Sequence, residues 1–162
     1  MADDIEKSSG RTIQFVNFRL GDEEFGADTS SVREITRVAD ISHIPEAPSF
    51  IKGVINLRGQ IIAVIDLCRQ FGLAQPEKLP ESARIVVAEV NGQTVGMLVD
   101  AVPEVLNIPE DNIEPTPELV RAKLDKGYIR GIARLENRLI ILLDLEKVLA
   151  GKEVEEITRS GA

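Results

Sequence analysis

The segment Ile51–Gly72, IKGVINLRGQIIAVIDLCRQFG, decides the fold. Its apolar run Gly53–Leu57 reaches the pair Arg58-Gly59, and a second, largely β-branched run follows. Two such runs joined by a short turn that contains glycine predict a hairpin of buried strands. Asp66 then has the side chain of a helix N-cap, and Gly72 suits the end of a short helix. The segment therefore predicts a strand, a turn, a second strand and a capped helix.

The same pattern occurs twice. Residues Ile129–Ala150, IRGIARLENRLIILLDLEKVLA, follow the first segment without a gap at an offset of 78 positions, and Phe15–Ile35 aligns with Ile85–Val105 at an offset of 70. The two offsets differ by an insertion of eight residues in the second copy, between Val105 and Ile129. Equivalent pairs are Gly26 and Gly96, Glu34 and Glu104, Gly53 and Gly131, and Asp66 and Asp144. The chain is therefore a diverged tandem duplication.

Each copy holds five short strand patterns with tight turns and one terminal helix, which predicts a small closed barrel of SH3 type because closure removes exposed strand edges. The fold class is thus mostly β, a tandem duplication of two SH3-like five-stranded barrels with short helices. The expected organisation is a disordered tail over 1–11, one domain over 12–150 made of subdomain 1 (about 12–72), a linker (73–82) and subdomain 2 (about 83–150), and a C-terminal tail or short helix over 151–162.

Composition excludes several classes of function. The net charge of -8 argues against nucleic-acid backbones and anionic membranes, which reward clustered lysine and arginine. A single cysteine excludes an internal disulfide framework and fits a reducing compartment. The acidic N-terminus does not read as a signal peptide, and no apolar run reaches the length of a membrane span. These features predict a cytoplasmic protein.

The equivalent carboxylates Asp66 and Asp144 invite an alternative reading, a carboxylate-dependent hydrolase of the duplicated-barrel type. Such enzymes carry Asp-Thr/Ser-Gly, whereas these two aspartates precede Leu-Cys and Leu-Glu. Asp28 begins the nearest approach to that motif, but its counterpart in the second copy is Leu98. Helix capping is the favoured interpretation of the pair.

Other reactive groups are sparse. His43 is the only histidine, and its loop position favours a surface or packing role over metal binding. Cys68 has no CxxC partner and is expected to be a structural thiol. No glycine-rich phosphate loop is present. We therefore expect no catalytic residues, no metal and no cofactor.

One possible charge pair carries positive information. Arg58 lies at the end of a hairpin, and Glu34 lies in the third strand pattern. If they meet, they form a charge-assisted pair that presents hydrogen-bond donors to a partner, although spacing alone allows two ordinary surface charges. Several apolar strand residues are expected to serve the contact between barrels or a partner, namely Val32, Ile35, Val54 and Ile55 in the first copy and Val102 and Val105 in the second.

Three strings, LGDEEFGADTSSVREI, IPEAPSFIKGVINLRGQIIAVIDL and VGMLVDAVPEVL, strongly resemble the chemotaxis coupling protein CheW family over about residues 12–150. The resemblance implies an adaptor without enzymatic activity that binds the cytoplasmic tip of chemoreceptors and the regulatory domain of the histidine kinase CheA, with no nucleic acid and no membrane insertion. Related kinases and coupler–receiver fusions need further domains, so a stand-alone coupler is expected at membrane-associated receptor arrays.

Site residues carry over from the family only where its motifs match. The VxEI strand and the NLRG turn imply a receptor-binding set of Val32, Glu34, Ile35, Asn56, Leu57, Arg58 and Gly59. The irregular segment and the following strand start imply a kinase-binding set of Ile44, Phe50, Ile51 and Gly53. A possible second kinase interface involves Glu114 and Leu119, where the family often has a basic and an aromatic residue.

Overall fold

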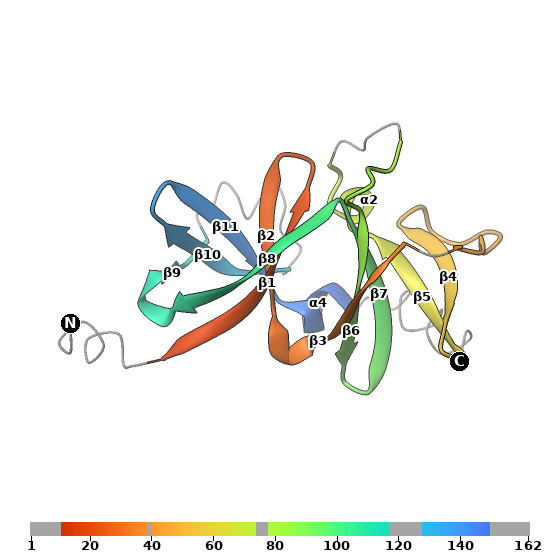
Figure 1. Ribbon diagram of the computed structural model, residues 1–162, viewed down its shortest axis with the longest axis horizontal. Coiled ribbons are helices and arrows are strands. Elements are labelled where there is room, and N and C mark those ends of the chain that lie inside the picture. The colour runs from red at the N-terminus through yellow and green to blue at the C-terminus, as the bar shows by residue number, and fades with distance from the viewer. Residues whose placement is uncertain (1–10, 39, 74–77, 117–127, 150–162) are drawn as a thin grey trace.

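The computed structural model describes residues 11–38, 40–73, 78–116 and 128–149. These residues form strands for the most part, arranged in two curled sheets with helix α4 (Leu145–Leu149) between them (Figure 1). The strands are β1 (Thr12–Leu20), β2 (Glu23–Asp28), β3 (Val32–Arg37), β4 (Ile51–Leu57), β5 (Gln60–Asp66), β6 (Arg84–Val90), β7 (Gln93–Val99), β8 (Ala101–Pro109), β9 (Ile113–Glu114), β10 (Ile129–Leu135) and β11 (Arg138–Leu143). The other helices are α2 (Leu67–Gln70) and two 3-10 turns, Thr29–Ser31 and Glu110–Asn112.

The described strands form one five-stranded and one six-stranded sheet. The five-stranded sheet has the order β3-β6-β7-β5-β4 and is called barrel 1; it is the right-hand lobe of Figure 1. The six-stranded sheet has the order β8-β1-β2-β11-β10-β9 and is called barrel 2. Its sixth strand has only two residues, and the equivalent contact in barrel 1 is a single bridge between Ser42 and Val54. The predicted fold class of two SH3-like barrels is confirmed.

The expected division into subdomains 12–72 and 83–150 does not match the sheets. Strands β1 and β2 of the first copy complete barrel 2, whereas β6 and β7 of the second copy complete barrel 1. The exchange is visible in the pairing of β1 with β8 and in two parallel pairings, β2 with β11 and β5 with β7. Because the copies are equivalent strand by strand, exchanging their first two strands preserves every type of contact. Barrel 1 is consequently the continuous stretch 32–99, inserted into barrel 2.

Turn and cap residues agree with the sequence prediction. The β4–β5 hairpin turns at Arg58 (φ 53°) and Gly59 (φ 87°), the positive φ angles of a type I′ turn. Helix α2 begins after Asp66, whose carboxylate accepts the Arg69 backbone N–H at 3.3 Å, and the chain leaves the helix through Gly72 at φ 70°. Asp66 is therefore an N-cap, as the sequence predicted.

Apolar side chains gather in three cores. One core fills barrel 1 and includes Ile55, Ile62, Val64, Ile85, Val87 and Leu98. A second fills barrel 2 and includes Phe15, Ile108, Ala133, Ile140 and Leu142. The largest lies between the barrels and draws on both sheets and on helices α2 and α4, including Phe18, Phe25, Met97, Leu67 and Val148. The shared core makes the two barrels one structural body.

The expected tails over 1–11 and 151–162 lie outside the described residues, apart from Arg11. Part of the expected linker, residues 74–77, lies outside them as well.

Candidate partner-binding surfaces

Glu34 and Arg58 form an ion pair, which their positions in the sequence had suggested as a possibility. The Arg58 guanidinium donates Nη1–H to Glu34 Oε2 at 2.7 Å and Nη2–H to Glu34 Oε1 at 3.0 Å. This geometry is bidentate, so it fixes the guanidinium plane as well as its position. The Arg58 side chain remains 77% exposed, and that of Glu34 is 21% exposed. The pair thus holds a hydrogen-bond donor in one orientation at the surface.

The residues predicted to bind the receptor lie on β3 and on the β4–β5 hairpin; we call them the Arg58 surface, defined as Val32, Glu34, Ile35, Asn56, Leu57, Arg58 and Gly59. Ile35, which follows Glu34 in β3, is 39% exposed. Val32 and Leu57 are half-buried and pack against the shared core and the barrel 1 core, respectively. Asn56 shapes the turn, because its Oδ1 accepts the Gly59 N–H at 2.8 Å. The Glu34–Arg58 pair therefore links the β3 residues of this set to its hairpin residues.

The predicted kinase-binding residues lie in and after the irregular segment that leads to β4. Ile44 and Phe50 are half-buried and pack against the shared core. Ile51 and Gly53 are buried, so they support the surface from below. A Cβ on Gly53 would collide with the backbone of Ser42, and the φ of 152° also favours glycine. We call the segment 41–52 the loop surface.

An open pocket of about 450 Å³ lies in the loop surface. Its walls come from the irregular segment, from β4 and from α2, and its lining residues are Ile41, His43, Ala47, Pro48, Ser49, Ile51, Lys52 and Arg69. His43, Lys52 and Arg69 are exposed, whereas Ile51 is buried. The pocket thus has an apolar side and a basic side, and none of its lining residues is acidic.

Of the predicted second kinase interface, only Glu114 lies within the described residues, since Leu119 falls outside them. Glu114 is on β9 and accepts a hydrogen bond from Arg134 Nε at 2.6 Å. This bond raises the pKa of Arg134. Glu114 is therefore already paired with a neighbouring strand.

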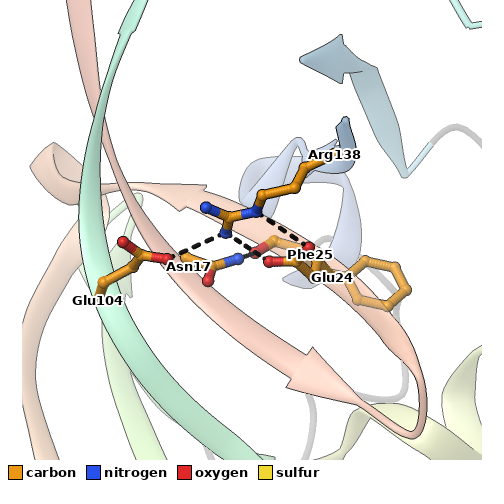
Figure 2. Close-up of polar contacts among 5 residues, drawn as sticks. All are labelled: Asn17, Glu24, Phe25, Glu104 and Arg138. Atoms are coloured by element: carbon orange, nitrogen blue, oxygen red, sulfur yellow. Dashed lines mark hydrogen bonds and ion pairs between the residues drawn. The ribbon is translucent and has the colours of Figure 1, made fainter. Parts of the chain in front are cut away.

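An ion-pair network at one end of barrel 2 joins three strands (Figure 2). Arg138, the first residue of β11, donates Nη2–H to Glu24 Oε1 at 2.6 Å and to Glu104 Oε2 at 3.0 Å. Its Nε–H also donates to Glu24 Oε2 at 3.3 Å. Buried Asn17 lies beside them and donates its Nδ2–H to the carbonyl oxygen of Phe25 at 3.2 Å. The network ties β11 to β2 and β8.

The electrostatics of the network follow from these bonds. The hydrogen bond from Arg138 lowers the pKa of Glu24, against the smaller opposing effect of burial. The same bonds raise the pKa of Arg138. Sequence reasoning did not single out Arg138, because its counterpart in the first copy is Gln60. The only sequence signal for this network was that Glu104 is equivalent to Glu34, the acid already considered as a partner for an arginine.

Candidate catalytic groups have structural roles. Asp66 and Asp144 each accept a backbone N–H of the helix that follows, from Arg69 and Lys147 respectively, both at 3.3 Å. Asp28 Oδ1 accepts the Ser30 N–H at 2.9 Å. The hydrolase alternative therefore gains no support.

Burial raises the pKa of the Cys68 thiol to about 12, with smaller contributions from nearby Asp100 and Asp66, so this thiol stays protonated at neutral pH. Among the residues that the structure describes, no three histidine, cysteine or acidic side chains gather closely enough to hold a metal ion. No helix of the described ranges is long and apolar enough to cross a membrane.

Two SH3-like barrels that share a core and expose an ion-paired hairpin are the architecture of an interaction module. The family model described as the CheW-like domain matches residues 14–153. The chain belongs to this family.

Relatives and a solved structure agree with this assignment. The chain is 37% identical to the probable chemotaxis protein CheW of Rhizobium etli over 142 residues, which covers 88% of this chain and 90% of that protein. It is also 37% identical to the chemotaxis protein CheW of Klebsiella aerogenes, with 93% and 90% covered. The crystal structure of the scaffolding protein TtCheW from Thermoanaerobacter tengcongensis matches with a TM-score of 0.76 at 41% identity, covering 83% of this chain and 86% of that one.

Proposed function

We propose that this protein is a non-catalytic adaptor that couples transmembrane chemoreceptors to the histidine kinase CheA. It acts in the cytoplasm, where it is recruited to membrane-associated receptor arrays in chemotaxis signalling. Family membership and the scaffolding relative support an adaptor role. The two partners follow from the family resemblance of the NLRG turn and the irregular segment.

The receptor tip binds at the Arg58 surface. The observation that carries this assignment is the bidentate pair of Arg58 and Glu34, which holds an exposed guanidinium in one orientation. Arginine is one of the residue types enriched in interface hot spots. Glu34 orients the arginine, and Asn56 fixes the turn that carries it.

The regulatory domain of the kinase binds at the loop surface. Ile44 and Phe50 offer partly exposed apolar area there, and buried Ile51 and Gly53 hold the segment in place. Glu114 and Leu119 belong to a second, optional contact with the kinase. Separate surfaces for the two partners are what an adaptor needs in order to hold both at once.

The experiment that tests this function uses Arg58→Ala in a mixture of receptor tip, kinase and adaptor. We expect receptor binding and kinase activation to fall, while thermal melting changes little because an exposed ion pair contributes only about 0–1 kcal/mol. Binding of the isolated kinase regulatory domain should persist, which serves as the control. Undiminished receptor binding by Arg58→Ala would contradict the assignment of this surface.

A further inference from the structure

We propose that the pocket in the loop surface receives a carboxylate side chain from the kinase regulatory domain, and that Lys52 is its main binding group. The proposal rests on the kinase contact proposed above. It adds the chemistry of the partner residue, an aspartate or a glutamate, which neither the family match nor the resemblance specifies. The internal duplication of the chain carries the argument.

The position equivalent to Lys52 in barrel 2 is Arg130, 78 residues later. Arg130 has an acidic partner within the chain, because its Nη1–H donates to Asp28 Oδ2 at 3.4 Å. Its guanidinium also lies over the Phe15 ring, 5.6 Å from the ring centroid. In barrel 2, therefore, the cation at this position is compensated internally.

Barrel 1 lacks the corresponding acid. The counterpart of Asp28, 70 residues later, is Leu98, which is buried in the barrel 1 core. Exposed Lys52 makes no ion pair with any residue in the described ranges. The same position of the barrel is thus paired in one copy and left unpaired in the other.

The rest of the pocket favours an anionic group. Arg69 adds a second cation, only partly neutralised by Asp66 at 3.9 Å, and its side chain is 50% exposed. His43 adds an imidazole, and no lining residue is acidic. Although the chain carries a net charge of -8, this hollow concentrates positive charge, and a concave site strengthens the attraction of an anion.

A partner that covers the loop surface must supply an acidic group that pairs with Lys52. Ile44 and Phe50 are direct chain neighbours of the pocket-lining residues His43, Ser49 and Ile51, so we infer that a partner packing on them also covers the pocket. Removing water from an unpaired ammonium group is costly unless an opposite charge replaces the lost hydration. The occupant that fits is therefore a carboxylate that approaches Lys52 with its stem against Ile41 and Ile51.

The test is a calorimetric titration of the full-length protein with the isolated regulatory domain of the kinase. Lys52→Glu should weaken binding by about tenfold or more, because it places two like charges together. Lys52→Arg should bind nearly as well as wild type, since it keeps the charge. Exposed Lys78, outside the pocket, supplies the matched control, and Lys78→Glu should change the affinity by less than about twofold. Melting curves check that each variant is folded.

A charge reversal in the partner identifies the acid. One aspartate or glutamate of the regulatory domain, when changed to lysine, should restore binding to Lys52→Glu and impair binding to wild type. Equal affinities for Lys52→Glu and Lys78→Glu would overturn the proposal while leaving the adaptor function intact. Failure of the wild-type protein to bind the regulatory domain would overturn the proposed function and this inference together. Loss of affinity in Lys52→Glu that no acid of the partner rescues would also count against a carboxylate occupant.

Discussion

Glu34 in barrel 1 and Glu104 in barrel 2 occupy equivalent positions, yet they obtain arginine partners from different places. Glu34 is paired with Arg58 from the hairpin turn, whose side chain is 77% exposed. Glu104 is paired with Arg138 from the start of the following strand, whose side chain is 37% exposed and also holds Glu24. The turn of barrel 2 has Glu136 where barrel 1 has Arg58.

The difference shows that one acid can serve two purposes. In barrel 2, Glu104 lies on the same side of β8 as the core residue Ile108, and Arg138 lies on the same side of β11 as the core residue Ile140. The hydrogen bond between Glu104 and Arg138 therefore lies next to the apolar core of the barrel. In barrel 1 the equivalent Glu34, whose side chain is 21% exposed, orients an arginine that is itself 77% exposed. Arg138 thus ties strands of barrel 2 together, whereas Arg58 stays exposed and is the arginine that we propose for partner recognition.

Each barrel contains strands from both sequence copies, so the largest expected effect is the loss of folding when one copy is removed. Residues 1–72, the first copy alone, should show no cooperative thermal transition by circular dichroism. Strands β1 and β2 would lack β8 and β11, and β3 would lack β6. The full-length protein is the control. A fragment with a sharp transition and well-dispersed amide resonances would contradict the strand exchange as a requirement for folding.

Arg138→Ala should destabilise the protein more than Arg58→Ala does. Removing Arg138 leaves Glu24 and Glu104 without their shared cation, at an expected cost of about 1–2 kcal/mol, because hydrogen bonds to charged groups are among the stronger ones. Arg58→Ala should cost about 0–1 kcal/mol. Urea denaturation followed by circular dichroism measures both. Equal losses would remove the distinction between the two barrel ends.

The stabilising effect of Arg138 should depend on pH. Since the bond from Arg138 lowers the pKa of Glu24 in the folded protein, its stabilisation is complete above the unfolded glutamate pKa of about 4.3 and is lost as the pH falls through the folded value. The difference in unfolding free energy between wild type and Arg138→Ala should therefore shrink from pH 6 to pH 3. Glu24→Gln should abolish much of this pH dependence. A difference that stays constant to pH 3 would refute the linkage.

The helix caps are expected to contribute less to stability than Arg138 does. Asp66→Ala should lower stability by about 1 kcal/mol through the lost N-cap, and Asp144→Ala should do the same at the equivalent helix. The two values should agree closely, because both carboxylates accept the same backbone bond. Unchanged stability of Asp66→Ala together with lost partner binding would mean that this residue is a contact and not a cap.

Local structure was predictable because it depends on neighbouring residues. The β4–β5 hairpin and the Asp66 cap are confirmed. The pairing of Glu34 with Arg58, 24 positions apart, was left open by their spacing and is observed in the structure. The exchange of strands between copies was not predictable. A duplication shows which residues are equivalent, but it does not show which copy supplies a neighbouring strand when both offer the same edge.

The candidate sites were also only partly predictable, because their arrangement depends on contacts between segments that are distant in the sequence. Ile51 and Gly53 were expected at the kinase contact, yet Ile51 is buried in the shared core and Gly53 is covered by Ser42, which pairs with β4. The sequence encodes neither arrangement in a short motif. The basic pocket and the Arg138 network were missed because each depends on side chains from distant segments. Lys52 and Arg69, for example, belong to β4 and α2.

The insertion of barrel 1 into barrel 2 also has a mechanical consequence. The chain passes between the barrels through two very short links, Thr29–Ser31 and the single residue Asp100. Asp100 is itself anchored, because its backbone N–H donates to the Arg19 carbonyl at 2.9 Å and its carboxylate accepts the Gly21 N–H at 2.7 Å. Because both links are short and the barrels share a core, we expect little rotation of one barrel relative to the other. We therefore expect any displacement of barrel 1 to carry β2 and β8 of barrel 2 with it, as parts of one rigid body.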